Sequence, residues 1–144
     1  MLGGLLKRRE KYAEARAQYG RAHELEPTSL YALVNLGGIC AALRNVGEAR
    51  RWYSELRAQC DHLIARDVAD YWTYLCLGEA AVAFGDEEGA VSAYRRAITL
   101  NLPVEDLRSA SEQLEFLVKS DFAIEIAGRV LPVLYERLSS QVRT

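Results

Sequence analysis

The chain repeats itself, and this internal repeat is the feature that most constrains its fold. When the 144-residue sequence is shifted by 34 residues, Leu2-Gly3-Gly4 falls on Leu36-Gly37-Gly38. A further shift of 41 residues places Leu36-Gly37 on Leu77-Gly78. The same two shifts align Ala15, Ala49 and Ala90, and also Tyr19, Tyr53 and Tyr94. Several unrelated coincidences at one offset are improbable, so we interpret the pattern as structural units that bury their apolar faces by stacking on one another.

The matched positions have helical spacing and predict pairs of helices. Helices approach closely only where side chains are small, so Gly3 with Ala15, Gly37 with Ala49 and Gly78 with Ala90 are expected to mark the crossing within each hairpin. The aligned tyrosines are then expected to fill the gap to the next hairpin. Thr28 or Ser29 and Asp86 are candidate N-caps. We expect eight helices, at about 1–9, 12–26, 29–43, 46–66, 69–84, 87–101, 104–119 and 122–141.

The residues of the repeat resemble the tetratricopeptide repeat family. One copy runs from Tyr12 through Ala15 and Ala22 to Pro27, and a nearly full copy has Tyr74, Leu77-Gly78, Gly85-Asp86, Ala90, Tyr94, Ala97 and Pro103. The middle copy departs from the pattern, with Arg44, Val46 and Leu56 in place of the usual Gly, Tyr and Ala. Over residues 2–103 the resemblance implies an all-α fold, a right-handed superhelical array of antiparallel helix hairpins (an α-solenoid) with about eight helices.

A fainter resemblance concerns the C-terminal half. The stretch from Asp70-Tyr71-Trp72 through Gly85-Asp86, followed by Leu107-Arg108-Ser109, is similar to the TRAFs-binding helical regulatory region of stress-activated kinase kinase kinases. It implies a regulatory role within a larger polypeptide.

We expect one domain, 1–144, made of four unequal parts. Residues 1–27 form a truncated first repeat, 28–67 a second repeat with an extended helix, 68–103 a third repeat, and 104–144 a degenerate capping hairpin. The extension follows from seven extra residues within 59–67, which lack Gly and Pro and therefore predict two further helical turns, either an interaction edge or a tolerated insertion. Pro132, inside the last apolar run, predicts a kink or restart.

The N-terminus begins in the middle of the repeat pattern. In the nearly full copy about six helical residues precede the Leu-Gly pair, whereas Leu2-Gly3 has one. Either the chain is excised from a longer protein or its first repeat is natively short. We favour excision.

Composition and charge exclude several classes of protein. A formal charge of −2 does not suit a protein that neutralises nucleic-acid phosphates, and it also weighs against an RNA-reading helical repeat. No apolar run reaches the roughly 18 residues of a membrane span, and the basic residues follow the N-terminal apolar ones, the reverse of a signal peptide. We therefore expect a cytoplasmic protein with no membrane or nucleic-acid partner. The odd cysteine count indicates buried thiols rather than a disulfide scaffold: Cys40, Cys60 and Cys76.

The sequence offers no set of residues for catalysis. His23 and His62 are the two histidines, and His23 is expected on the surface beside Glu24 and Glu26. Cys60 and His62 supply two of the four ligands that a structural zinc site needs, and a spacing of two on a helix points them apart. We expect no enzyme activity, no metal and no cofactor.

The family resemblance implies a concave groove, lined by the first helix of each hairpin, that holds a peptide or helix of a partner. By alignment its residues are Lys7, Arg8, Tyr31, Val34, Asn35, Trp72, Leu75 and Glu79, with Gly38 and Cys76 beside them. Tyr31 and Trp72 either line this groove or pack in the core. Recognition of chaperone C-termini is not expected, because only Asn35 matches the residues that some members use for it.

The sequence therefore predicts a non-catalytic protein-protein interaction module within a larger protein. The alternative is self-association through an exposed apolar first helix that carries Leu2, Leu5 and Leu6.

Overall fold

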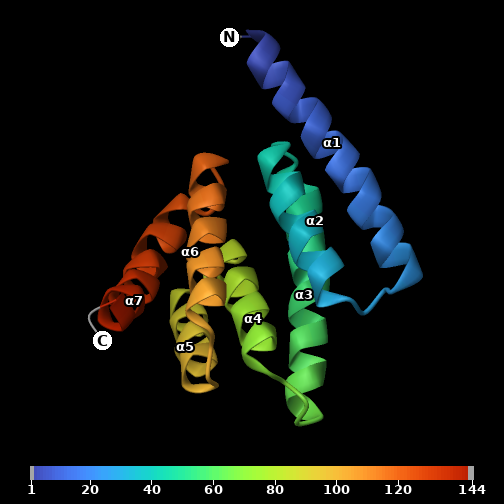
Figure 1. Ribbon diagram of the computed structural model, residues 1–144. Helices are drawn as coiled ribbons and strands as arrows, with labels where there is room; N and C mark the ends of the chain where they lie inside the picture. The colour runs from blue at the N-terminus through green and yellow to red at the C-terminus, as the bar shows by residue number, and fades with distance from the viewer. Residues whose placement is uncertain (1, 143–144) are drawn as a thin grey trace.

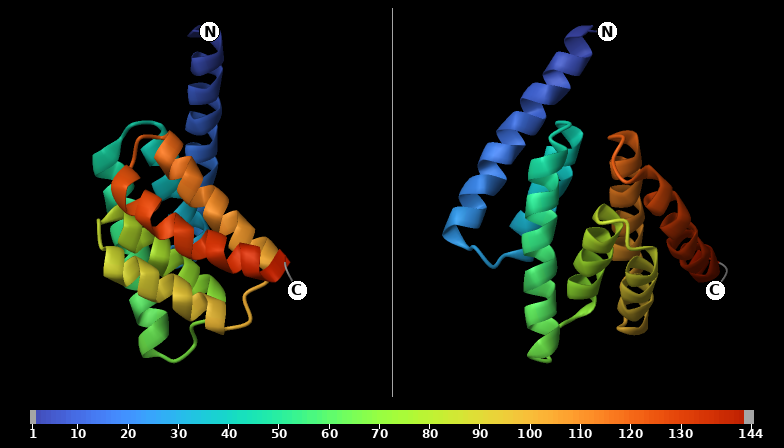
Figure 2. Two further views of the ribbon diagram at one scale, coloured as in Figure 1. Left: turned by 90° about the vertical axis from the view of Figure 1, so that its left-hand side faces the viewer. Right: turned by 180° about the vertical axis from the view of Figure 1, so that it is seen from behind.

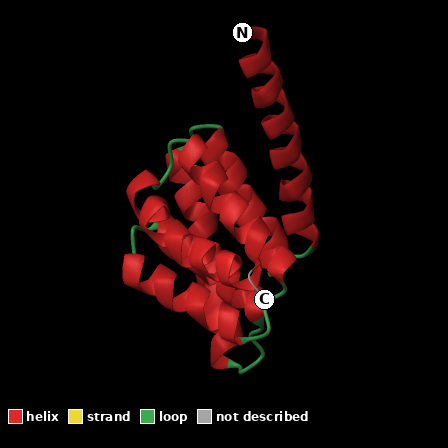
Figure 3. Cartoon of the chain, turned by 60° about the vertical axis from the view of Figure 1, so that its left-hand side comes forward, coloured by secondary structure: helices red, strands yellow, loops and turns green. Residues whose placement is uncertain are grey.

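The computed structural model describes residues 2–142, and side chains from Arg9 to Gln141. All regular structure in this part of the chain is α-helical, which confirms the predicted all-α class (Figure 3). Seven helices are present in it: α1 (Leu2–Leu25), α2 (Leu30–Ala42), α3 (Val46–Ala65), α4 (Tyr71–Ala83), α5 (Glu87–Thr99), α6 (Val104–Lys119) and α7 (Ile124–Val142). None of these described helices combines the length and the apolar composition needed to cross a bilayer.

Consecutive helices pack in pairs, α2 with α3, α4 with α5 and α6 with α7 (Figure 1). The first two pairs turn in the same way. Arg44 and Gly85 follow the first helix of each pair in the left-handed conformation, with φ of 64° and 73°. The next residue, Asn45 or Asp86, donates its N–H to the carbonyl five residues earlier at 2.9 Å and caps the second helix with its side chain. The two turns, which lie 41 residues apart in the sequence, therefore have the same backbone geometry.

A glycine and a tyrosine close each of these two hairpins. A Cβ at Gly37 would lie 2.7 Å from the ring of Tyr53, and a Cβ at Gly78 would lie 2.7 Å from the ring of Tyr94. Both rings are fully buried. Each tyrosine thus packs on the glycine of its own hairpin. Tyr53 also reaches other hairpins, because its hydroxyl donates to Glu79 and its ring stacks on Phe122 with the ring centroids 6.1 Å apart.

The N-terminal segment is one helix, so the predicted break between 1–9 and 12–26 is wrong. Helix α1 runs unbroken for 24 residues. The expected turn contains Glu10 and Lys11, which favour helix, and no Gly, Pro or capping residue ends the first segment there. Gly3 and Tyr19 consequently lie about 24 Å apart along one axis. The glycine–tyrosine contact of the later hairpins is not made within this copy.

Helix α1 packs on α2 and reaches α3 through side chains. Arg16 pairs with Glu48 at 2.6 Å, and the rings of His23 and Trp52 meet edge to face at 5.0 Å. His23 is thereby partly buried, and its expected surface position is wrong. The N-terminal half of α1 extends beyond the other helices (Figures 1 and 2).

Helix α3 is long, as the seven extra residues predicted. Helix α3 has 20 residues and α5, its counterpart, has 13. The added turns pack on the molecule along one face. Cys60 is fully buried and its thiol donates to the Thr73 carbonyl at 3.5 Å, while Leu63 packs against the core. The extension therefore anchors the start of α4.

The last hairpin folds back over the others. Helix α7 packs on α5, and α6 packs on α2. The predicted apolar stripe of α6 is buried, with Leu107, Leu114 and Leu117. Helix α7 continues through Pro132 without the restart that proline suggested. Because Pro132 has no N–H, the carbonyl of Gly128 lacks its helical hydrogen-bond donor. Both residues are exposed, so water can donate to that carbonyl.

Candidate binding pocket

The contact between α6 and α2 encloses a pocket of about 200 Å³ between α2, α4 and α6. Helix α5 contributes one residue at its base. The pocket is lined by Tyr31, Val34, Asn35, Trp72, Leu75, Cys76, Glu79, Tyr94, Asp106, Ser109, Ala110 and Gln113.

Six of the eight residues predicted for the groove lie around this pocket: Tyr31, Val34, Asn35, Trp72, Leu75 and Glu79. The other two, Lys7 and Arg8, lie outside the described side chains. Tyr31 is 58% exposed and Trp72 38% exposed, so both line the pocket and neither belongs to the core. Val34 and Leu75 are buried and form its apolar floor.

The pocket also contains residues that the sequence reasoning missed, above all those of α6. The expected groove was lined by α2 and α4, whereas α6 supplies a further wall of the pocket. Residues Asp106, Ala110 and Gln113 are spaced three to four apart, beside the buried leucine stripe. That spacing is a signal for one helical face, and it could have indicated which part of α6 faces the first helices.

Neighbouring side chains hold the rim of the pocket. The rings of Tyr19 and Tyr31 meet edge to face at 5.7 Å, and the hydrogen bond between them, together with burial, raises the pKa of Tyr19. The Asn35 amide donates to the Tyr31 carbonyl at 2.8 Å. On the opposite wall, interaction with Asp106 raises the pKa of Tyr71. The ring contact with Tyr19 and the Asn35 hydrogen bond restrain Tyr31 on the rim.

Glu79 forms the polar base of the pocket. It is 5% exposed, and its Oε2 accepts hydrogen bonds from the Tyr53 hydroxyl at 2.6 Å and from the Gln113 amide at 3.2 Å. Burial raises the pKa of Glu79 to about 7, against the opposing effect of both hydrogen bonds. Gly38 makes room for this arrangement, since a Cβ there would lie 2.7 Å from Gln113 Nε2.

The pocket combines apolar, aromatic and polar side chains. Cys76 is buried and desolvation raises its pKa, so it remains a thiol rather than a nucleophilic thiolate. Among the described side chains, no group of three or more His, Cys, Asp or Glu residues could hold a metal ion. What the pocket presents is aromatic rings at the rim, aliphatic side chains below and carboxylate and amide groups at the base. The chain matches no protein-family model and no curated protein, so its function has to be inferred from this site.

Proposed function

We propose that the chain is a non-catalytic protein-interaction module of the tetratricopeptide type, and that a peptide or helix of a partner protein binds at the pocket between α2, α4 and α6. The observation that supports this function is the composition of the pocket. Tyr31 and Trp72 present partly exposed rings above a buried floor that contains Glu79. Aromatic anchors over a mostly apolar cavity with a few polar groups are typical of binding hot spots.

The repeat type is supported by the two hairpins that share one construction. Gly37 with Tyr53 and Gly78 with Tyr94 occupy matching positions, and both hairpins have the same turn. The packing of α6 on α2 shortens the groove that this repeat type implies. The partner is therefore anchored by a few residues and not along an extended channel.

A peptide-display selection against the whole chain tests this function. Selected peptides should bind the wild type, and the double substitution Trp72→Ala with Glu79→Gln should weaken binding at least tenfold without lowering helicity or the melting temperature. The control is Tyr135→Ala, which removes an aromatic ring of similar exposure (44%) from α7, outside the pocket. The function is refuted if no peptide is selected, or if the double variant binds the selected peptides as the wild type does.

Self-association is the second candidate, and one observation favours it. The N-terminal half of α1 extends past the other helices of the described chain, so a second copy could pack along it (Figures 1 and 2). The side chains of Leu2, Leu5 and Leu6 lie outside those described. Sedimentation at several concentrations tests this candidate, which a strict monomer would exclude.

A further inference from the structure

The described residues that line the pocket include two acids and no base. Its two carboxylates are Glu79 and Asp106, and no Lys, Arg or His among the described side chains lines it. Elsewhere on the molecule several acids have arginine partners: Glu48 has Arg16, Glu87 has Arg129 and Asp121 has Arg44. An unbalanced acidic cavity is complementary to a cation.

The aromatic rings at the rim also lack a cation–π contact with any described arginine. Three rings outside the pocket have a guanidinium over them at 5.2 to 5.8 Å, in the pairs Arg51 with Trp52, Arg57 with Phe84 and Arg96 with Tyr74. Among the described residues, no such contact is made to Trp72 or Tyr31. The faces of these two rings can therefore accept a cation from outside the chain.

The carboxylate of Glu79 is held in an orientation that a ligand can use. Both donors within the described chain, Tyr53 and Gln113, reach Oε2, which leaves Oε1 for a group that enters the pocket. A charged carboxylate that is 5% exposed is disfavoured unless it is paired. A cation placed against it would supply that pairing.

The size of the pocket indicates how much of a ligand it holds. A volume of about 200 Å³ is below the roughly 300 to 1,000 Å³ of pockets that take a whole small ligand. It suits a single long side chain that projects from a larger partner.

We infer that the pocket binds the protonated side chain of a lysine or arginine presented by the partner segment, with its aliphatic stem between Trp72 and Tyr31, its cationic head directed to Glu79 at the base, and the Asp106 carboxylate on the rim adding attraction at longer range. The inference rests on the proposed function, since it names the anchor that the partner segment supplies. Lysine and arginine suit both parts of the site, because each has an apolar stem and a charged head. A partner without such a residue should bind the pocket weakly.

The first test uses the acetylated methylamides of lysine, arginine and norleucine as probes of the full chain. The two tryptophan indole N–H signals are followed by NMR, with Trp72 as the reporter and Trp52, outside the pocket, as the internal reference. The lysine or arginine derivative should shift the Trp72 signal and leave Trp52 unchanged. The uncharged norleucine derivative should bind at least tenfold more weakly. Equal binding of all three derivatives, or no shift of Trp72 with either cation, overturns the inference.

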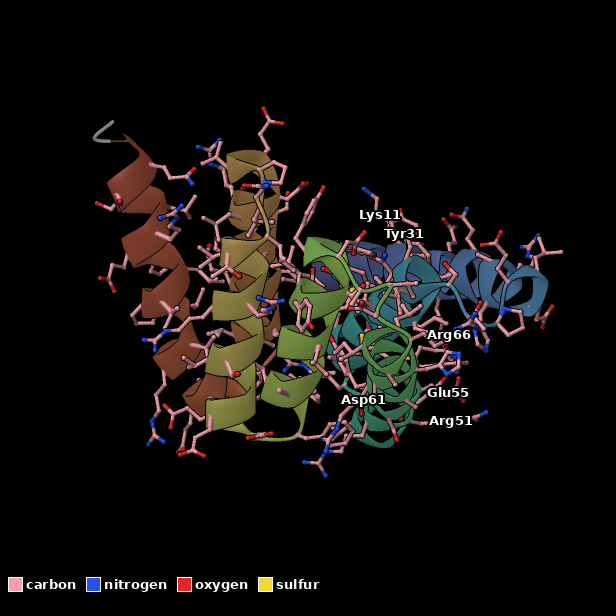
Figure 4. The ribbon with its side chains drawn as sticks, turned by 90° about the horizontal axis from the view of Figure 1, so that it is seen from below. Lys11, Tyr31, Arg51, Glu55, Asp61 and Arg66 are labelled. Atoms are coloured by element: carbon pink, nitrogen blue, oxygen red, sulfur yellow. The ribbon has the colours of Figure 1, made fainter. Side chains whose placement is uncertain are left out.

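Charge-removing variants complete this test. Glu79→Gln should weaken binding of the cationic probes at least tenfold, and Asp106→Asn should weaken it less, because Asp106 lies on the rim. Asp61→Asn is the matched control, because Asp61 is an exposed acid on α3 that lies well away from Tyr31 (Figure 4). Unchanged affinity in the Glu79→Gln variant would overturn the assignment of the cationic head to this carboxylate.

The second test separates this inference from the proposed function. Peptides selected by display should be rich in lysine or arginine, and replacing that residue by norleucine should weaken them at least tenfold. Selected peptides that compete at Trp72 but tolerate the replacement overturn the inference and leave the proposed function intact. If the lysine derivative binds but no peptide does, the occupant is a free amine, which overturns the peptide source together with the proposed function.

Discussion

Replacement of Glu79 by glutamine isolates the effect of one buried charge on stability. Glutamine keeps the shape of the side chain and an oxygen that can accept from Tyr53 and Gln113, but it cannot ionise. At about pH 5 the carboxyl is mostly protonated in the folded protein, so wild type and variant are both neutral there. Well above pH 7 only the wild type holds a buried charge. The variant should then be the more stable protein.

The magnitude follows from the pKa of Glu79, which burial raises from 4.5 to about 7. The folded protein keeps this proton to a higher pH than the unfolded chain does. The free energy of unfolding therefore falls as the pH rises from about 4.5 to about 7, and this contribution is constant above that range. At 1.36 kcal/mol for each pKa unit, the total loss is about 3 kcal/mol. Tyr53, Tyr94 and Cys76, which face the carboxylate, have raised pKa values and stay neutral throughout.

Urea unfolding followed by circular dichroism, at several pH values from about 5 to about 8.5, measures the difference between variant and wild type. Both proteins contain the two histidines, so their titration cancels in this difference. The difference should grow with pH and reach about 3 kcal/mol in favour of Glu79→Gln. A difference that stays constant across the range would show that the carboxyl titrates normally, and would refute the reasoning about its burial.

Three further results are expected. Gly37→Ala should lower the free energy of unfolding by about 1 kcal/mol, because crowding of the buried Tyr53 ring outweighs the gain in helix propensity. Gly128→Ala has open space at its Cβ and should raise the free energy of unfolding by about 0.5 kcal/mol. Urea unfolding of both variants measures these differences. Arg44→Gly and Arg44→Ala both remove the hydrogen bond to the Ser120 carbonyl, but only glycine suits the left-handed φ of 64°. The free energy of unfolding should therefore be about 1 kcal/mol higher for Arg44→Gly than for Arg44→Ala. The three cysteines should resist alkylation in native protein at pH 8 and react fully in urea, because burial raises their pKa values, to about 11 for Cys40 and about 12 for Cys60.

Much of the fold could be predicted because the signals for its helices come from residues that are close in sequence. Ser29 and Asp86 cap their helices as expected, and seven residues without Gly or Pro lengthened α3 by the predicted two turns. Each of these features depends on residues close in sequence. The error at the N-terminus has the opposite origin. The similarity of Leu2-Gly3 to Leu36-Gly37 suggested a break in α1. The segment has no residues that form a turn, and its helix-favouring residues keep α1 continuous.

The pocket was predicted only in part, for a reason that lies in the stacking of the hairpins. The residues of α2 and α4 could be named because the family pattern says which face of each first helix is turned inward. That pattern gives no information on a degenerate last hairpin. The position of α6 depends on contacts between distant segments, such as the hydrogen bond from Arg44 in the α2–α3 turn to the Ser120 carbonyl beyond α6.

Three helix pairs contribute to the base of the pocket. Tyr53 comes from the pair α2 and α3, Glu79 from the pair α4 and α5, and Gln113 from the pair α6 and α7. The Tyr53 hydroxyl and the Gln113 amide both donate to the Glu79 carboxylate. None of the three hairpins could hold Glu79 in this environment alone. The packing of α6 on α2 thus shapes the pocket and also buries the Glu79 carboxylate, which makes its charged form unfavourable in the free protein. A cation that enters the pocket would stabilise that charged form.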